Sequence, residues 1–247
     1  MTHRLPVILL ALAAALTPVR AAQTQTVDEL LARNIKAKGG MEKLRSIQTV
    51  KQTGRLNIQG MEGKQVVYAK RPNLLRQELT MSGTLVVMAF DGQTPWMINP
   101  NLGAAAPIAM TGPLAEMIKD QSSFDGPLID YKAKGYLIDL VGPETLAGRQ
   151  VYHLKLTDKA RQVQHCYLDA ETGLEAKLVS QNEMGQSFEQ ELSDYRDVEG
   201  IKVPFSIRTL SNGVQQGQIT VDKVEFNVKI DDAIFKLPKS GDEAMRR

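Results

Sequence analysis

The sequence predicts a mainly β fold, built as one strongly curved antiparallel sheet or a barrel, with helices only near its start and in its middle. Two observations lead to this prediction. From Thr49 onward the chain holds about a dozen runs in which apolar and polar residues alternate, separated by short turns rich in Gly, Asn and Asp. These runs follow one another without the helical crossovers that parallel strands require, so sequence neighbours are expected to pair antiparallel.

The first residues have the features of an export signal. A basic start precedes an apolar run that is too short to span a bilayer. Val19 and Ala21 fit cleavage after Ala21, with cleavage after Ala22 as the alternative. We therefore expect residues 1–21 to be a signal peptide and residues 22–247 to form a single exported domain.

The mature chain is expected to be electrically neutral. The sequence has 30 basic and 28 acidic residues, and removal of the signal peptide takes away Arg4 and Arg20 but no acid. A neutral chain without a basic block is a poor partner for nucleic acid or for an anionic membrane surface. Cys166 is the only cysteine, so no intramolecular disulfide is possible and stability has to come from apolar burial.

One helical pattern opens the mature chain. Thr26 followed three residues later by Glu29 is a capping box, and Gly39-Gly40 marks the end of the helix. A short second helical piece follows, up to Ile47. The apolar stripe of the first helix consists of Val27, Leu30, Leu31 and Ile35. This helix has too little apolar surface to stand alone, so we expect it to lie on the sheet.

The stretch "LLRQELTMSGTLVVMAFDGQTPWMIN" predicts an antiparallel meander. Asp91-Gly92 between two apolar runs is a strong hairpin signal, and a Ser-Gly turn separates the two runs before it. Pro72 falls between strands, where the loss of a backbone N–H costs least. Both faces of the run Thr84–Phe90 are apolar, so the pattern leaves open which of them points inward.

Residues 101–136 interrupt the strand pattern. The segment "NLGAAAPIAMTGPLAEMIKDQSS" is apolar without alternation, and Thr111 is expected to cap a short helix with Leu114, Met117 and Ile118 on one face. A long apolar insertion of this kind is uncommon in a compact sheet protein unless it covers something.

Strands resume near Tyr136 and continue almost to the end of the chain. Each strand has one apolar face, as Tyr152, Leu154 and Leu156 illustrate, and a polar face opposite. A small closed barrel fills its interior with such side chains, whereas a wider or open barrel leaves room for a ligand. The period of the pattern fits both.

The stretch "YAKRPNLLRQELTM…LVVMAFDGQTPWMINP" (Tyr68–Pro100) resembles the signature region of LolA-type periplasmic lipoprotein carriers and of the wider outer-membrane lipoprotein-sorting group. In that family a Lys-Arg-Pro-Asn corner leads into a strand, and an Asp-Gly-x-x-x-Trp hairpin ending in Asn-Pro follows. The order of expected elements is similar over most of residues 26–238.

This resemblance implies a half-open antiparallel barrel with an apolar cavity and a helical lid, made here of Val27–Ile47 and Leu102–Ile118. The family's lid-latching arginine falls on Arg71, which would bond backbone carbonyls of the closed lid and release them when acyl chains enter. On residue type alone, Arg71 would be a solvated turn residue. The residues expected to line the cavity are Leu56, Ile58, Leu75, Leu79, Met81, Val86, Met88, Trp96, Tyr152, Leu154 and Phe205. The residues expected on the lid are Leu30, Leu31, Ile35, Leu114, Met117 and Ile118.

The function implied is that of a periplasmic carrier that shields acyl chains of a lipoprotein or another lipid on the way to the outer membrane. It would act as a monomer, without a cofactor, between an inner-membrane donor and an outer-membrane acceptor. Each methylene exposed to water costs about 0.8 kcal/mol, so such a carrier has to replace the membrane almost completely. Flexible methionines suit the site. The alternative is a periplasmic sensor of the same fold that binds lipid or a protein partner without transporting it.

No motif predicts an enzyme or a metal site. His153 and His165 are the only histidines after the signal peptide, and His165 points away from Cys166 because neighbours in a strand face opposite sides. The sequence shows no metal-ligand spacing, nucleophile elbow or phosphate-binding glycine loop.

Overall fold

The structure, a computed structural model, describes residues 25–181 and 185–238. The expected signal peptide, residues 1–21, lies outside the described residues. None of the described helices has the length and apolar character needed to cross a bilayer.

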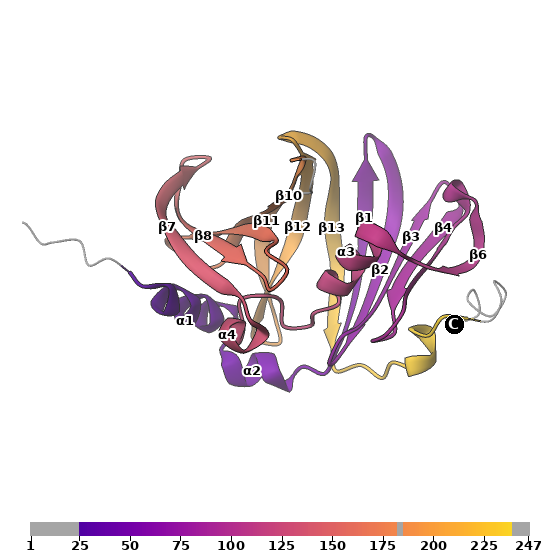
Figure 1. Ribbon diagram of the computed structural model, residues 1–247, viewed down its shortest axis with the longest axis horizontal. Coiled ribbons are helices and arrows are strands. Elements are labelled where there is room, and N and C mark those ends of the chain that lie inside the picture. The colour runs from indigo at the N-terminus through magenta and orange to yellow at the C-terminus, as the bar shows by residue number, and fades with distance from the viewer. Residues whose placement is uncertain (1–24, 182–184, 239–247) are drawn as a thin grey trace, which may run out of the picture.

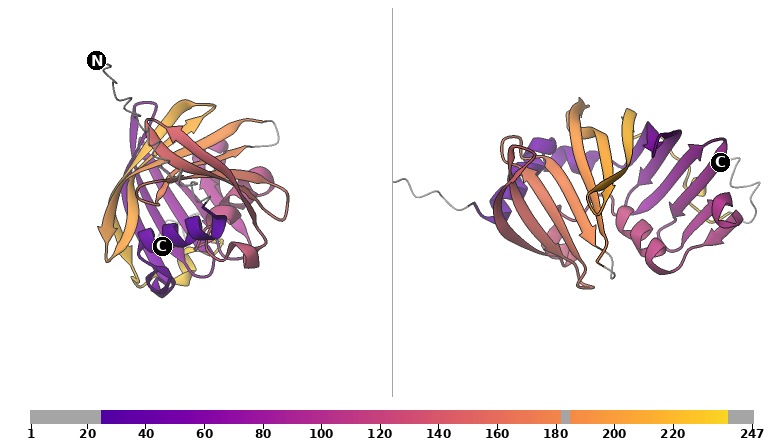
Figure 2. Two further views of the ribbon diagram at one scale, coloured as in Figure 1. Left: turned by 90° about the vertical axis from the view of Figure 1, so that its left-hand side faces the viewer. Right: turned by 90° about the horizontal axis from the view of Figure 1, so that it is seen from above.

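The strands of the described residues form one 13-stranded antiparallel sheet (Figure 1). Successive strands pair within β1–β6 and within β7–β13, and β1 joins β13 across the middle. The strands are β1 (Thr49–Ile58), β2 (Met61–Lys70), β3 (Leu74–Met81), β4 (Thr84–Phe90), β5 (Pro95–Asn99), β6 (Ala104–Ala109), β7 (Leu137–Leu146), β8 (Arg149–Thr157), β9 (Val163–Asp169), β10 (Glu175–Gln181), β11 (Ser187–Val198), β12 (Ile201–Ser211) and β13 (Val214–Phe226). Because β6 and β7 do not pair, the sheet stays open although it curves like part of a barrel (Figure 2). The predicted fold class is confirmed, in its half-open form.

Helices precede the sheet and occupy the central insertion. They are α1 (Val27–Lys38), α2 (Met41–Ser46), α3 (Gly112–Gln121) and α4 (Tyr131–Lys134). The capping box at the start of α1 is present, with the Thr26 N–H donating to the Glu29 carboxylate at 2.8 Å. At the end of α1, a Cβ on Gly39 would lie 2.4 Å from the Gly200 carbonyl oxygen, so this position needs glycine for space as well as for its positive φ.

The pairing register assigns each strand residue to one of two faces, because alternate side chains in a strand point to opposite sides. We call the face that α1 and α3 pack against the inner face. There, Leu31 of α1 packs with Leu154 of β8, and Ile118 of α3 packs with Phe90 of β4. The two predicted lid segments therefore lie on the same face, over opposite flanks of the sheet.

The opposite, outer face of β3–β5 is covered by the C-terminal segment that contains the 3-10 turn η2 (Asp232–Ile234). The Trp96 indole N–H donates to the Phe235 carbonyl at 2.6 Å, and Arg76 donates to the Ile234 carbonyl at 2.9 Å. Phe235 itself is fully buried. This flank consequently has apolar, buried side chains on both faces, which explains the doubly apolar run in β4.

The central insertion contains a strand that the sequence pattern did not predict. The segment "AAAPIA" forms β6 and pairs with β5 although it lacks alternation. Pro107 is tolerated because β6 is an edge strand, where a missing N–H removes no ladder bond on the free side. Thr111 precedes α3 as expected, but its side chain makes no capping hydrogen bond.

Candidate functional site

Most of the residues expected to line a cavity share the inner face. Leu79 pairs with Val86 and lies on the same face as Phe90, which α3 covers, and the same reasoning extends strand by strand across the sheet. The residues placed on the inner face in this way are Leu56, Ile58, Leu75, Leu79, Met81, Val86, Met88, Tyr152, Leu154 and Phe205.

Trp96 is the exception, and its expected place in a cavity wall is wrong. It pairs with Ala89, whose side chain points away from the face that carries Met88. Trp96 is fully buried in a cluster on the outer face, beneath the C-terminal segment to which its indole N–H is bonded. Trp96 therefore anchors the C-terminal segment around Phe235 to the outer face of the sheet.

The middle of the inner face keeps apolar side chains partly exposed. The main helix–sheet contacts are those of α1 with β7 and β12 and those of α3 with β4 and β5. On the strands between these flanks, the partly exposed inner-face residues that we call the central band are Ile58, Val67, Leu79, Met81 and Ile219. Apolar surface left in contact with water costs free energy, which a bound apolar ligand would recover.

Helix α3 covers a methionine-rich part of the inner face. Met88 and Met97 pack against the buried cluster that contains Met110 and Ile118. Met117, by contrast, is 41% exposed, so it does not share the buried face of α3 as expected. In the described part of the chain, one side-chain hydrogen bond joins α3 to the sheet, from Gln77 to Gln121 at 2.9 Å.

Helix α1 is attached to the sheet by several polar contacts. Arg33 donates to two backbone carbonyls of the β9–β10 turn, each at 2.6 Å, and Asn34 donates to a third at 2.9 Å. Lys38 forms an ion pair with the buried Glu175 at 2.8 Å. Burial alone would raise the pKa of Glu175, but the Lys38 ammonium outweighs it and lowers that pKa, so the pair is charged. Because Leu31 of α1 is buried against the sheet, apolar contacts hold the helix in place together with these polar ones.

Arg71 joins the two helical segments. Its Nε donates to the Ile47 carbonyl at 2.6 Å and its Nη2 to the Leu44 carbonyl at 3.0 Å. Two further N–H groups donate to the two carboxylate oxygens of Asp125, each at 2.6 Å, and the guanidinium stacks on the Phe124 ring. These hydrogen bonds from Arg71 lower the pKa of Asp125. Arg71 thus contacts carbonyls of the first lid segment as expected, and also a carboxylate in the insertion that sequence reasoning missed.

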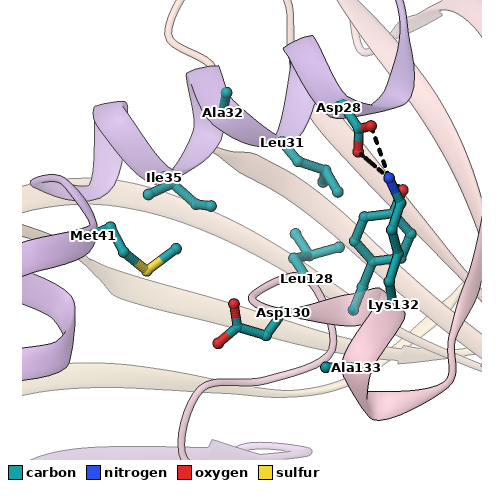
Figure 3. A pocket seen from close by; sticks show the side chains of 10 residues that line it. Asp28, Leu31, Ala32, Ile35, Met41, Leu128, Asp130, Lys132 and Ala133 are labelled. Atoms are coloured by element: carbon teal, nitrogen blue, oxygen red, sulfur yellow. Dashed lines mark hydrogen bonds and ion pairs between the residues drawn. The ribbon is translucent and has the colours of Figure 1, made fainter.

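A pocket of about 380 Å³ lies among α1, α2 and α4 (Figure 3). Its apolar lining includes Leu31, Ile35 and Leu128, and Lys132 contacts Asp28 beside it at 2.9 Å. Hydrogen bonds from Lys132, together with one from a neighbouring tyrosine, lower the pKa of the Asp28 carboxyl. Ile35, which was expected on the lid, lines this pocket between the helices together with Leu31.

Cys166 carries no reactive thiolate. It is buried on the inner face beneath α1, and burial raises the pKa of its thiol. The described residues also contain no group of three His, Cys, Asp or Glu side chains placed to ligate a metal ion.

Comparison with known proteins identifies the fold. No family model matches the chain, and no curated protein matches its sequence. Among solved structures, a DUF1329 family protein from Desulfovibrio piger is similar over 85% of this chain and 97% of its own, with a TM-score of 0.57 and 14% identity. A LolA superfamily protein from Nitrosomonas europaea is similar over 86% of this chain and 98% of its own, with a TM-score of 0.57 and 14% identity. A domain from Vibrio parahaemolyticus, named as a candidate outer membrane lipoprotein-sorting protein, covers 85% and 97%, with a TM-score of 0.55 and 12% identity. The chain has a LolA-like fold.

Proposed function

We propose that the chain is a periplasmic carrier that binds acyl chains of a lipoprotein or another lipid on the inner face of its sheet and carries them toward the outer membrane. The observation that supports this proposal best is the central band, which is apolar, partly exposed and flanked by two helical covers. The similar Vibrio domain is named for lipoprotein sorting, which agrees with it. Residues 1–21 would act as the signal peptide, and residues 22–247 would work as one monomeric domain without a cofactor or catalytic residue.

An acyl chain needs such a surface because exposing hydrocarbon to water costs free energy. A chain of sixteen carbons in water costs on the order of 10 kcal/mol. The curved inner face offers apolar contact along several strands, and the partly buried methionines beneath α3 can adjust to chains of different shape. An inner-membrane donor and an outer-membrane acceptor would complete the route.

Arg71 is proposed as the latch that keeps the helical covers closed. Hydrogen bonds to a charged group contribute roughly 1.5–3 kcal/mol each, which is enough to bias a lid between two states without locking it. Arg71→Leu should keep the fold and change the dissociation rate of a fluorescent fatty-acyl probe by several-fold. Arg45→Leu is the matched control, because Arg45 lies on α2 but its guanidinium pairs with the exposed Asp130 at the surface. Equal dissociation rates in Arg71→Leu and wild type would remove the latch from the proposal.

The carrier function itself is tested by ligand identification. Native mass spectrometry of the protein purified from cells should reveal copurified lipid or lipoprotein. Leu79→Gln, on the inner face, should weaken binding of the fatty-acyl probe roughly thirtyfold, because burial of a leucine side chain is worth about 2 kcal/mol and each 1.4 kcal/mol is roughly a factor of ten. Thr80→Gln, at the next position but on the outer face, should leave binding unchanged. A protein that is consistently free of lipid and takes up no probe would contradict the carrier and favour the sensor alternative.

A further inference from the structure

Two histidine side chains meet on the outer face of β8 and β9. His153 Nε2 lies 2.7 Å from His165 Nδ1. Leu154 and Cys166, the neighbours of these histidines along the strands, pair with each other on the inner face beneath α1, so both histidines point to the other side of the sheet. The carrier proposal uses neither of them.

The surroundings of His153 fix its ring in one orientation. Glu144 on β7 places a carboxylate oxygen 2.6 Å from His153 Nδ1, and the Tyr167 ring stacks on the imidazole at a centroid distance of 4.4 Å. Only 9% of His153 is exposed. When Nδ1–H donates to the carboxylate, Nε2 carries its lone pair toward His165. A carboxylate that holds the far nitrogen of an imidazole in this way is the usual support of a metal-binding histidine.

We propose that His153 Nε2 and His165 Nδ1 together bind a divalent transition-metal ion of the Zn²⁺ or Cu²⁺ type. Zinc–nitrogen bonds of about 2.0–2.1 Å at a tetrahedral angle place two ligand nitrogens roughly 3.3 Å apart. The present separation of 2.7 Å has to widen only slightly, and the partly exposed His165 can rotate to do so. No third protein ligand stands nearby among the described residues, so water completes the coordination and leaves the ion exchangeable.

Metal binding requires the protons of the pair to rearrange. The proton that now lies on His165 Nδ1, between the two rings, is released to solvent when the ion binds, and His165 takes up a proton from water on Nε2, which faces away from His153. Glu144 adds a negative charge close to the ion, whereas Lys155 opposes it. Lys177 and Glu189, on the neighbouring strands of the same face, neutralise each other as an ion pair.

The experiment is a calorimetric titration of the untagged protein with Zn²⁺ and with Cu²⁺, in a His3→Ala background so that an uncleaved N-terminus contributes no ligand. We expect one metal ion per chain, with Cu²⁺ bound more tightly than Zn²⁺. His165→Gln should weaken binding by roughly tenfold or more, and Glu144→Gln by roughly tenfold through loss of ring orientation. Binding should fall as the pH drops below the range in which histidine is neutral.

A spectroscopic readout separates this site from a merely structural histidine pair. Electron paramagnetic resonance of the Cu²⁺ complex should show coupling to two nitrogens, reduced to one in His165→Gln. The probe for fatty-acyl binding should bind equally well with and without metal, because the two sites lie on opposite faces. Equal metal affinity in wild type and in the double variant His153→Gln/His165→Gln would overturn the proposal, as would failure of the wild type to bind either ion in the titration.

Discussion

At the scale of single residues, Arg71 connects the end of α2 to Asp125, which lies in the turn between α3 and α4. The side chains are 20% and 24% exposed, and two parallel N–H···O bonds fix their geometry. Because Arg71 also donates to carbonyls at the end of α2, loss of the Asp125 charge removes one side of a three-way contact. Acid should therefore weaken this contact between α2 and the central insertion.

The pH dependence of stability tests this expectation. The hydrogen bonds from Arg71 hold the pKa of Asp125 below its ordinary value of 3.8 in the folded state. A lowered folded pKa means stabilisation that is complete above the unfolded value and is lost as the pH falls through the folded one. We expect Asp125→Asn to lower the free energy of unfolding by about 1–2 kcal/mol at pH 7, after allowance for solvent screening, and the difference to shrink below about pH 4.

Urea denaturation of wild type and variant at pH 7, 5 and 3 measures that difference. Asp130→Asn is the control, because Asp130 pairs with Arg45 at an exposed site and should contribute 1 kcal/mol or less, roughly the median for surface ion pairs. A difference for Asp125→Asn that persists undiminished at pH 3 would show that the carboxylate charge is not what matters.

Trp96 provides a second test at this scale. Trp96→Phe removes the indole N–H that donates to the Phe235 carbonyl and leaves that buried carbonyl unpaired. The free energy of unfolding should fall by about 1–3 kcal/mol, whereas the affinity for a fatty-acyl probe should stay unchanged because Trp96 lies on the outer face. If Trp96→Phe weakens probe binding and leaves the free energy of unfolding unchanged, Trp96 contacts the ligand and the outer-face assignment is wrong.

The residues that could be predicted from the sequence are those whose role is local or shared with a family pattern. Arg71 was located by the Arg-Pro corner, but its partner Asp125 is 54 positions away in a stretch rich in turns, and no local pattern links them. The inward face of β8 followed from simple alternation. The placement of Trp96 did not, because the C-terminal segment buries the outer face of β5 and so removes the polar side from the pattern.

At the scale of elements, the two helical covers differ in how they are attached. Three side chains of α1 make polar contacts with the β9–β10 region, and its buried leucines add apolar contact. Helix α3 rests on a methionine-rich cluster and has the single side-chain bond between Gln77 and Gln121 to the sheet in the described chain. Flexible apolar contacts are easier to exchange for acyl chains than buried polar ones. We therefore expect α3 to move and α1 to act as a fixed cover.

Hydrogen exchange measured by mass spectrometry distinguishes the two helices. Amides of Val27–Lys38 should exchange more slowly than those of Gly112–Gln121 in the ligand-free protein, since local opening follows the number of contacts that must break. Addition of a fatty-acyl probe should change exchange in α3 and leave α1 unaffected. Lys38→Met, which leaves Glu175 buried without its partner, should bring the exchange of α1 closer to that of α3. Equal protection of both helices with and without probe would contradict the assignment of a moving and a fixed cover.

At the scale of the whole molecule, an open sheet of this length has two free edges. Whether the barrel is open or closed could not be derived from the period of the strands, since inward-facing residues alternate alike in both. The resemblance in Tyr68–Pro100 implied an open barrel, and the strand order shows it. Edge strands invite pairing with a second copy unless something interrupts them. On β7 the interruption is visible as a bulge between Leu140 and Gly142, followed by Pro143.

The exposed side chains of β7 show why that protection matters. Leu137 is 69% and Val141 is 55% exposed, so the edge carries apolar surface beside its unpaired backbone. Asp139 lies between them and is exposed, and a charge at an edge opposes the approach of an identical edge. The balance between these features determines whether the protein stays monomeric.

We expect the purified wild-type protein to be monomeric and Asp139→Val to associate. The substitution replaces the charge with a β-branched apolar residue and makes Leu137–Val141 continuously apolar, which favours pairing with another copy. Light scattering after size exclusion should give a higher mean mass for Asp139→Val at concentrations where the wild type is monomeric. Asp222→Val is the control. This substitution also removes one exposed negative charge, but Asp222 lies on the interior strand β13 and not at an edge of the sheet. If both variants associate alike, net charge rather than the edge controls the assembly, whereas a wild type that is already dimeric would mean that β7 or β6 is an interface between copies.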